Sequence, residues 1–89
     1  MKTIWKFNLP INDYCTIQIP KNCKILKVAE QNNKIMLWAQ VDDCEDKENV
    51  TFRIAGTGHP LGAEILKYLD SAVMYNGGLV FHVYKVIEH

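Results

Sequence analysis

Residues 24–41 read KILKVAEQNNKIMLWAQV and carry the clearest secondary-structure signal in the chain. On each side of Asn32-Asn33 the side chains divide onto two faces with the two-residue period of a β-strand. Asparagine tolerates positive φ better than most residues, so this pair suits the tight turn of a hairpin. Trp38 faces one side of the second strand and Leu37 the other. Both faces are therefore partly apolar, which predicts a central strand or a strand with one face at an interface.

Turn signals and strand-forming residues recur about every ten residues along the rest of the chain. Further strands are predicted at residues 3–9, 14–19, 50–55 and 79–86. The first two most simply pair with each other as a hairpin, and Asn76-Gly77-Gly78 is a strong turn signal before the last strand. Residues 61–69 fit a short helix, which Gly62 disfavours, or an extended segment that begins near Lys67.

The 89 residues predict a single domain, residues 1–89, because a chain of this length supports one small core. The predicted fold class is mainly β: a small antiparallel sandwich or partly closed barrel of six to seven strands with at most one short helix. The predicted core consists of apolar residues on inward-facing strand positions: Ile4, Phe7, Ile17, Ile19, Leu26, Val28, Leu37, Phe52, Ile54, Val80 and Val83.

Composition limits the function. A hydrophobic fraction of 48% argues against disorder, and a net charge of zero argues against general DNA or RNA binding. Three widely spaced cysteines lack zinc-site spacing and suit reduced thiols of the cytoplasm. No apolar run approaches the ~20 residues of a membrane span. Residues 42–49 contain five acids, which favours a solvated loop over a calcium site, and we expect no metal or cofactor.

The stretch Phe52 to Pro60 contains the most informative candidate site. Its Gly-Thr-Gly-His-Pro ending lets the backbone turn so that successive N–H groups can trap an anion. Thr57 offers a hydroxyl, His59 a titratable ring, and Arg53, the one arginine of the chain, a fork of donors. The candidate ligand-binding residues here are Arg53, Gly56, Thr57, Gly58 and His59. An ordinary tight turn, with Arg53 paired to a surface acid, is the alternative, since neither common phosphate fingerprint is present.

Aromatic residues supply further candidates. His82 and Tyr84 share one face of the last strand, where they suit stacking on a flat ligand or, equally, a core histidine beside a carbonyl. Trp5 and Trp38 could stack on a base, although core packing explains each tryptophan as well. Lys6 is a weaker candidate on the first strand.

The sequence favours binding over turnover. His59 and His82 could together perform the general acid–base chemistry of a phosphodiesterase. The tandem His-x-Thr/Ser signature of such enzymes is missing, however. The spacing of the cysteines does not indicate nucleophilic catalysis, and the acids cluster in one loop, which does not suit two-carboxylate hydrolysis. We therefore expect a protein that is not an enzyme.

Five motifs together resemble a family of small bacteriophage proteins. They are Trp5-Lys6-Phe7-x-Leu9, Lys24-Ile25-Leu26, Leu37-Trp38-Ala39, Phe52 to Pro60, and Phe81-His82-Val83-Tyr84. The resemblance implies a sponge, which sequesters the cyclic nucleotide signals of bacterial defence systems such as CBASS. It implies non-enzymatic binding of a cyclic dinucleotide such as 3′3′-cGAMP in the cytoplasm of the infected host, by a homo-oligomer. A structural or protein-interaction accessory protein, or a weak histidine-based phosphodiesterase, is the alternative.

Overall fold

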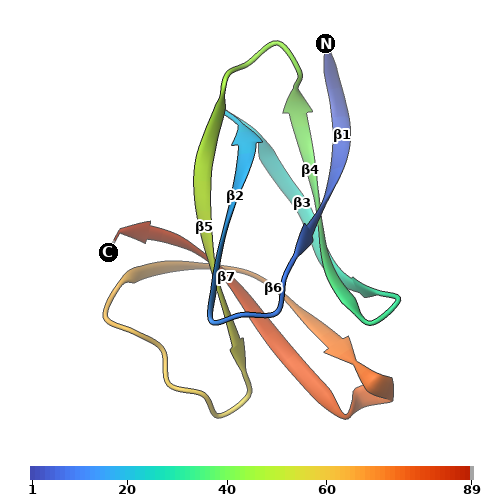
Figure 1. Cartoon of the computed structure of the whole chain (residues 1–89), viewed down its shortest axis with the longest axis vertical. Helices are drawn as coiled ribbons and strands as arrows, with labels where there is room; N and C mark the ends of the chain where they lie inside the picture. Colours follow the sequence, from blue (N-terminus) through green and yellow to red (C-terminus); the bar gives the residue numbers. More distant parts are fainter. Residues whose placement is uncertain (89) are drawn as a thin grey trace.

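Seven β-strands make up most of the computed structural model, which describes residues 1–88 (Figure 1). The strands are β1 (Lys2–Leu9), β2 (Tyr14–Pro20), β3 (Lys24–Gln31), β4 (Lys34–Asp42), β5 (Lys47–Gly56), β6 (Ile65–Met74) and β7 (Leu79–Glu88). A 3₁₀ turn, η1 (Tyr75–Gly77), is the one helical element of the described residues. Within residues 1–88, no helix has both the length and the apolar character that crossing a membrane requires.

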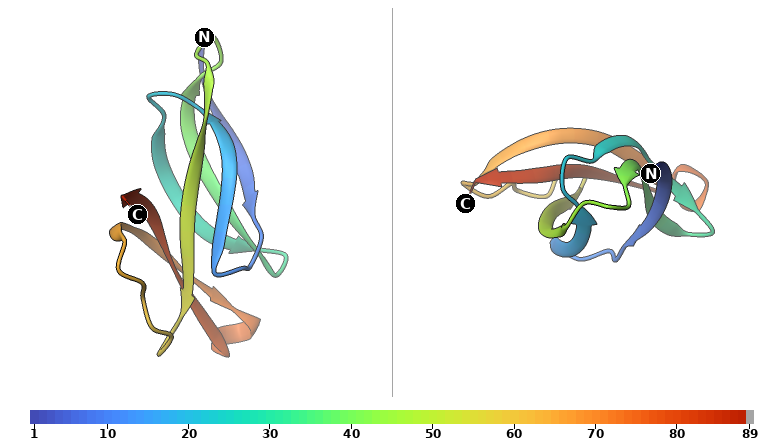
Figure 2. Two further views of the ribbon diagram at one scale, coloured as in Figure 1. Left: turned by 60° about the vertical axis from the view of Figure 1, so that its left-hand side comes forward. Right: turned by 90° about the horizontal axis from the view of Figure 1, so that it is seen from above.

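The strands form two antiparallel sheets that are not closed into a barrel, so the predicted sandwich is confirmed. One sheet has the order β1-β4-β3 and the other β2-β5-β7-β6. Figure 2 shows that the molecule is flat, with extents of 39 × 31 × 16 Å. The core lies between the sheets, and edge strands β3 and β6 lie side by side where the sheets meet.

The hairpin predicted from residues 24–41 is confirmed. Asn32 and Asn33 both have positive φ, 54° and 60°, as a tight two-residue hairpin turn requires. β4 lies in the middle of its sheet, and Leu37 on its inward face is fully buried. Trp38 on the opposite face is partly exposed.

The predicted pairing of the first two strands is wrong. β1 pairs with β4, with Trp5 opposite Ala39, and β2 pairs with β5 in the other sheet. Residues 10–13 therefore cross from one sheet to the other. Both strands alternate in the same way whichever neighbour they have, so periodicity carried no information about the partner.

The predicted core is mostly confirmed. Six of its residues are buried: Ile19, Val28, Leu37, Phe52, Ile54 and Val83. Phe7, Ile17 and Val80 are partly buried. The predicted core positions of Ile4 and Leu26 are wrong, because these residues are 59% and 44% exposed. Ile4 lies on the outer face of β1, and Leu26 lies at a β-bulge between Ile25 and Lys27 that shifts the alternation of β3.

The segment after Pro60 is not a helix. Residues 57–64 form a loop that leads into β6, and β6 pairs with β7 as the last hairpin. Asn76 and Gly77 take positive φ in the connecting turn, 54° and 92°. The short helix considered from the sequence is thus replaced by extended backbone, because Gly62 weakens a helix and β7 offers Ile65–Met74 a hydrogen-bonding partner.

Candidate ligand-binding site

The Gly-Thr-Gly-His segment forms a tight turn directly after β5. The His59 N–H donates to the Gly56 carbonyl at 3.0 Å, and the Gly56 N–H donates to His59 Nδ1 at 3.3 Å. Gly58 has a φ of 89°, which other residues rarely adopt, and the space where a Cβ would sit is open. Outside the strand ladder, the N–H groups of Thr57 and Gly58 have no hydrogen-bond partner within residues 1–88.

A chain of side-chain hydrogen bonds connects this turn to the sheet. His82 on β7 bonds through Nε2 to Thr57 Oγ1 at 2.9 Å and through Nδ1 to Ser71 Oγ at 2.8 Å. Ser71 on β6 also bonds to the Tyr68 hydroxyl at 2.7 Å. A neutral imidazole has one donor and one acceptor nitrogen. With a neutral His82, the hydrogen bonds to Thr57 and Ser71 therefore run in the same donor-to-acceptor direction. His82 thereby holds Thr57 against the outer face of the sheet.

These groups surround a pocket of about 210 Å³. Its lining residues are Ala55, Gly56, Thr57, Gly58, His59, Leu61, His82 and Tyr84. Six of the ten residues predicted from the sequence therefore come together around one hollow. Tyr84 and His82 project from the same face of β7, as their spacing predicted, and Tyr84 packs edge-to-face on Tyr68 at 5.5 Å.

Arg53, which the sequence predicts as a ligand-binding residue, does not line this pocket. Its side chain is only 5% exposed. Nη1 donates to the carbonyl oxygens of Asp13 at 3.1 Å and Ile54 at 2.6 Å, and Nη2 donates to that of Pro60 at 2.9 Å. The Asp13 carboxylate lies 3.5 Å from Nη1 but is 80% exposed, so that ion pair is weak. Both terminal nitrogens of the guanidinium therefore donate to backbone carbonyls.

Arg53 and its neighbour Tyr14 hold the loop after the turn. The guanidinium carbon lies 5.3 Å from the centre of the Tyr14 ring, and the Tyr14 hydroxyl donates to the Glu64 carboxylate. That hydrogen bond raises the pKa of Tyr14 above its usual value. The carbonyl of Pro60 and the carboxylate of Glu64 are thus both bonded to side chains of the sheet. Arg53 therefore helps to fix the position of the loop that follows the Gly-rich turn.

The other three candidates lie in the other sheet, away from the pocket. Trp5 is partly buried, packs against the core, and meets Phe7 edge-on at 6.4 Å. Lys6 Nζ donates to Gln31 Oε1 at 2.9 Å, and Lys6 lies opposite Trp38 across β1 and β4. The structure therefore separates Trp5, Lys6 and Trp38 from the Gly-rich turn.

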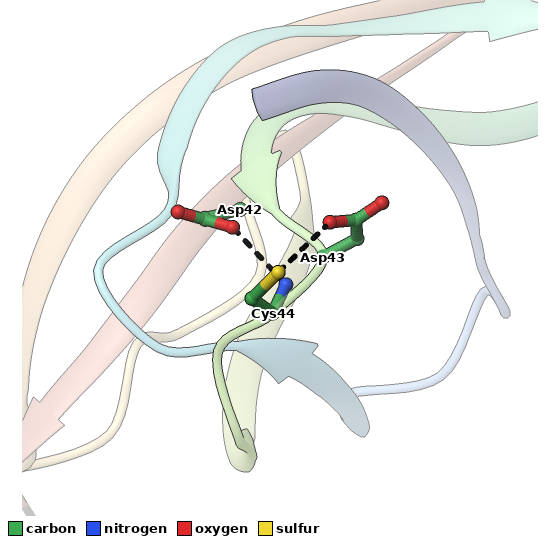
Figure 3. Close-up of side chains that lie close together, drawn as sticks. All are labelled: Asp42, Asp43 and Cys44. Atoms are coloured by element: carbon green, nitrogen blue, oxygen red, sulfur yellow. Dashed lines mark hydrogen bonds between the residues drawn. The ribbon is translucent and has the colours of Figure 1, made fainter. Parts of the chain in front are cut away.

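The acidic loop lies at the far end of the long axis from the Gly-rich turn (Figure 1). Figure 3 shows Asp42, Asp43 and Cys44 close together, with possible ligand atoms within 4.8 Å of one another. The amino group of Met1 lies 2.8 Å from Asp43 and 3.2 Å from Asp42. The N–H of Cys44 lowers the pKa of Asp42, and the Met1 amino group lowers that of Asp43. One cation therefore already pairs with both carboxylates of this cluster and offsets part of their charge.

A sequence profile of the DUF7352 family, a domain of unknown function, matches residues 1–89. The chain belongs to the DUF7352 family. No curated protein and no solved structure matches the chain.

The DUF7352 domain has a second and larger hollow, about 460 Å³, which sequence reasoning missed. It lies between β3 and β6 and is lined in part by Lys24, Lys27, Lys67 and Lys85. These lysines come from three separate strands and stand in no motif. Only the approach of the two sheet edges places them together, so the sequence held no local signal for this cleft.

Proposed function

We propose that this protein binds and retains a small anionic nucleotide without converting it. The proposed ligand is a cyclic dinucleotide of bacterial defence signalling, such as 3′3′-cGAMP, and the proposed role is sequestration of that signal by a phage protein in the infected cell. The observation that carries the proposal is the pocket at the Gly-rich turn, where six residues from separate parts of the chain surround one hollow.

The polar groups of the pocket suit a phosphate or a base edge. The N–H groups of Thr57 and Gly58 are suited to form an anion-binding nest. Apart from the strand ladder, neither has a hydrogen-bond partner among residues 1–88. His59 Nδ1 accepts a hydrogen bond from Gly56, so a neutral His59 carries its proton on Nε2 and can donate it to a ligand oxygen. The Tyr84 ring offers an aromatic wall.

The histidine contacts favour retention over hydrolysis. A general base needs an available nitrogen and a group that orients the ring. Both ring nitrogens of His82 bond to hydroxyl groups, and Nδ1 of His59 accepts from a backbone N–H, so neither neutral ring has an acceptor nitrogen free for an incoming water. These contacts use the rings to hold the turn in place, which is the property that a trap needs.

The size of the pocket favours a shared site. Ligand pockets commonly measure about 300–1,000 Å³, and the pocket of one chain is about 210 Å³. A cyclic dinucleotide would therefore extend beyond it. We propose that a second copy of the chain completes the site, as symmetric assembly of identical chains allows.

A retention assay tests the proposal. The protein is mixed with a panel of cyclic dinucleotides that includes 3′3′-cGAMP, freed of unbound ligand, and denatured by heat. We expect intact ligand to be released. Release of cleaved product would indicate a phosphodiesterase and not a sponge. The absence of any retained ligand would overturn the proposal.

Two threonines provide matched variants for this assay. Thr57→Val removes the hydroxyl that contacts His82 and lines the pocket. Thr16→Val removes a hydroxyl that pairs with Thr51 at 2.8 Å elsewhere on the same sheet. We expect Thr57→Val to weaken retention about five- to tenfold, the effect of one or two lost hydrogen bonds, and Thr16→Val to leave it unchanged. Equal effects would place the ligand away from the turn.

One observation favours protein interaction as a second candidate function. Tyr14 and Tyr68 are 44% and 54% exposed, and they belong to a row that crosses the outer face of the four-stranded sheet with Arg53 and Tyr84. Exposed tyrosines are enriched at protein interfaces. If the assay releases no nucleotide, this row becomes the leading candidate for a contact surface.

A further inference from the structure

β3 and β6 lie side by side where the two sheets meet edge to edge (Figure 2). A cleft lies between these two strands. The contact between the strands includes a hydrogen bond from the Val28 N–H to Asp70 Oδ2 at 3.4 Å. The cleft volume is about 460 Å³. Its lining residues are Cys23, Lys24, Ile25, Leu26, Lys27, Val28, Lys67, Tyr68, Leu69, Asp70 and Lys85.

Irregularities in both strands lie at the cleft. The register of β3 shifts between Ile25 and Lys27, and that of β6 shifts between Tyr68 and Asp70. A β-bulge bends its strand and changes the direction of the neighbouring side chains. Two bulges on facing edges therefore keep the strands from closing against each other along this part of their length.

The cleft concentrates positive charge in a protein whose net charge is zero. It contains four of the chain's nine lysines and one acid. Lys67 and Lys85 lie directly opposite each other on β6 and β7, an arrangement in which like charges repel. No ion pair joins these lysines to a carboxylate among the side chains that the structure describes.

The single acid of the cleft is already engaged. Asp70 accepts hydrogen bonds from the N–H groups of Ser71, at 2.9 Å, and Val28. Its carboxylate therefore satisfies backbone donors at the bulge and pairs with no lysine. Asp70 is the one carboxylate that lines the cleft, so the four lysines outnumber the acids beside them.

We infer that this cleft binds a phosphate-bearing small molecule that has an aromatic or apolar portion, the chemistry of a nucleoside phosphate. Lysine ammonium groups are effective point charges for phosphate. Ile25 and Leu69 provide an adjacent apolar surface for a base. The volume lies within the range of ordinary ligand pockets. The inference is independent of the proposed function, because the lysines of the cleft do not line the pocket at the Gly-rich turn.

Calorimetric titration of the whole protein with ADP tests the inference. The cleft variant is Lys67→Gln/Lys85→Gln, and the control variant, Lys2→Gln/Lys34→Gln, removes the same charge from exposed lysines outside the cleft. We expect the cleft variant to bind ADP about tenfold or more weakly, and the control to change by less than about twofold. Adenosine, which lacks phosphate, should bind far more weakly than ADP.

Three results would overturn the inference: no ADP binding by the unmodified protein, equal losses in both variants, or equal binding of adenosine and ADP. Thermal unfolding distinguishes lost binding from lost folding. Removing both of the opposed like charges should leave the Tm of the cleft variant unchanged or higher. Absence of ADP binding at the cleft would not contradict the proposed cyclic-dinucleotide site, because the retention assay tests variants of the Gly-rich turn.

Discussion

At the scale of single residues, Arg53 shows how one buried side chain can hold two loops in place. Its two terminal nitrogens donate to three backbone carbonyls, from Asp13, Ile54 and Pro60. Its Nε is buried without a partner in the described structure. These bonds join the loop before β2 and the loop after β5 to the same strand. We therefore expect the conformation of the Gly-rich turn to depend on the Arg53 guanidinium, which bonds to Pro60 directly after it.

Arg53→Ala should destabilise the fold. The substitution removes three hydrogen bonds from the guanidinium to backbone carbonyls, one of them buried and two partly buried, so we expect the free energy of unfolding to fall by about 1.5–3 kcal/mol. Urea denaturation measures the change. Lys6→Ala is the control, because it removes an exposed cation with a single hydrogen bond and should stay within about 0.5 kcal/mol. An Arg53→Ala variant as stable as the original would contradict this structural role.

At the scale of elements, the register irregularities explain where strand periodicity failed. β4 alternates without interruption, and its inward residues Leu37, Ala39 and Val41 are all buried. β3 alternates only up to its bulge, so Leu26 is exposed although its spacing predicted a core position. A bulge adds one residue to a strand and reverses the faces beyond it. The same irregularity opens the lysine cleft.

Leu37 and Leu26 give a matched pair for testing this account. Leu37→Ala removes a fully buried side chain from the central strand and should cost about 2–5 kcal/mol of stability. Leu26→Ala should cost less than about 0.5 kcal/mol, because the side chain is already 44% exposed. Chemical denaturation of both variants measures the difference. Equal losses would mean that the Leu26 side chain is covered in solution.

At the scale of the whole molecule, the flat sandwich separates four kinds of surface. The acidic loop and the Gly-rich turn lie at opposite ends of the long axis (Figure 1). The lysine cleft lies between β3 and β6. The outer face of the four-stranded sheet has the row of tyrosines. A net charge of zero therefore conceals an uneven distribution, with five acids in residues 42–49 and four lysines at the cleft.

The shared-site proposal predicts a change of native mass. A single chain has a mass of 10.2 kDa, and we expect saturating 3′3′-cGAMP to favour a species of at least twice that mass, measured by light scattering after size exclusion. Thr57→Val should reduce the ligand-dependent part of the change. A monomer that retains intact ligand would show that one copy suffices for binding.

The sequence alone determined the strands, the turns and the local composition of the candidate site. Alternation and the positive-φ preference of asparagine and glycine are properties of neighbouring residues, so they predicted the 24–41 hairpin and placed Gly56 to His59 in one turn. Tertiary structure alone decided that β1 pairs with β4, that Arg53 is buried on carbonyls, and that four distant lysines share a cleft. Each of these depends on contacts between segments far apart in the chain, where burial and hydrogen bonding select one arrangement from several that the same local pattern permits.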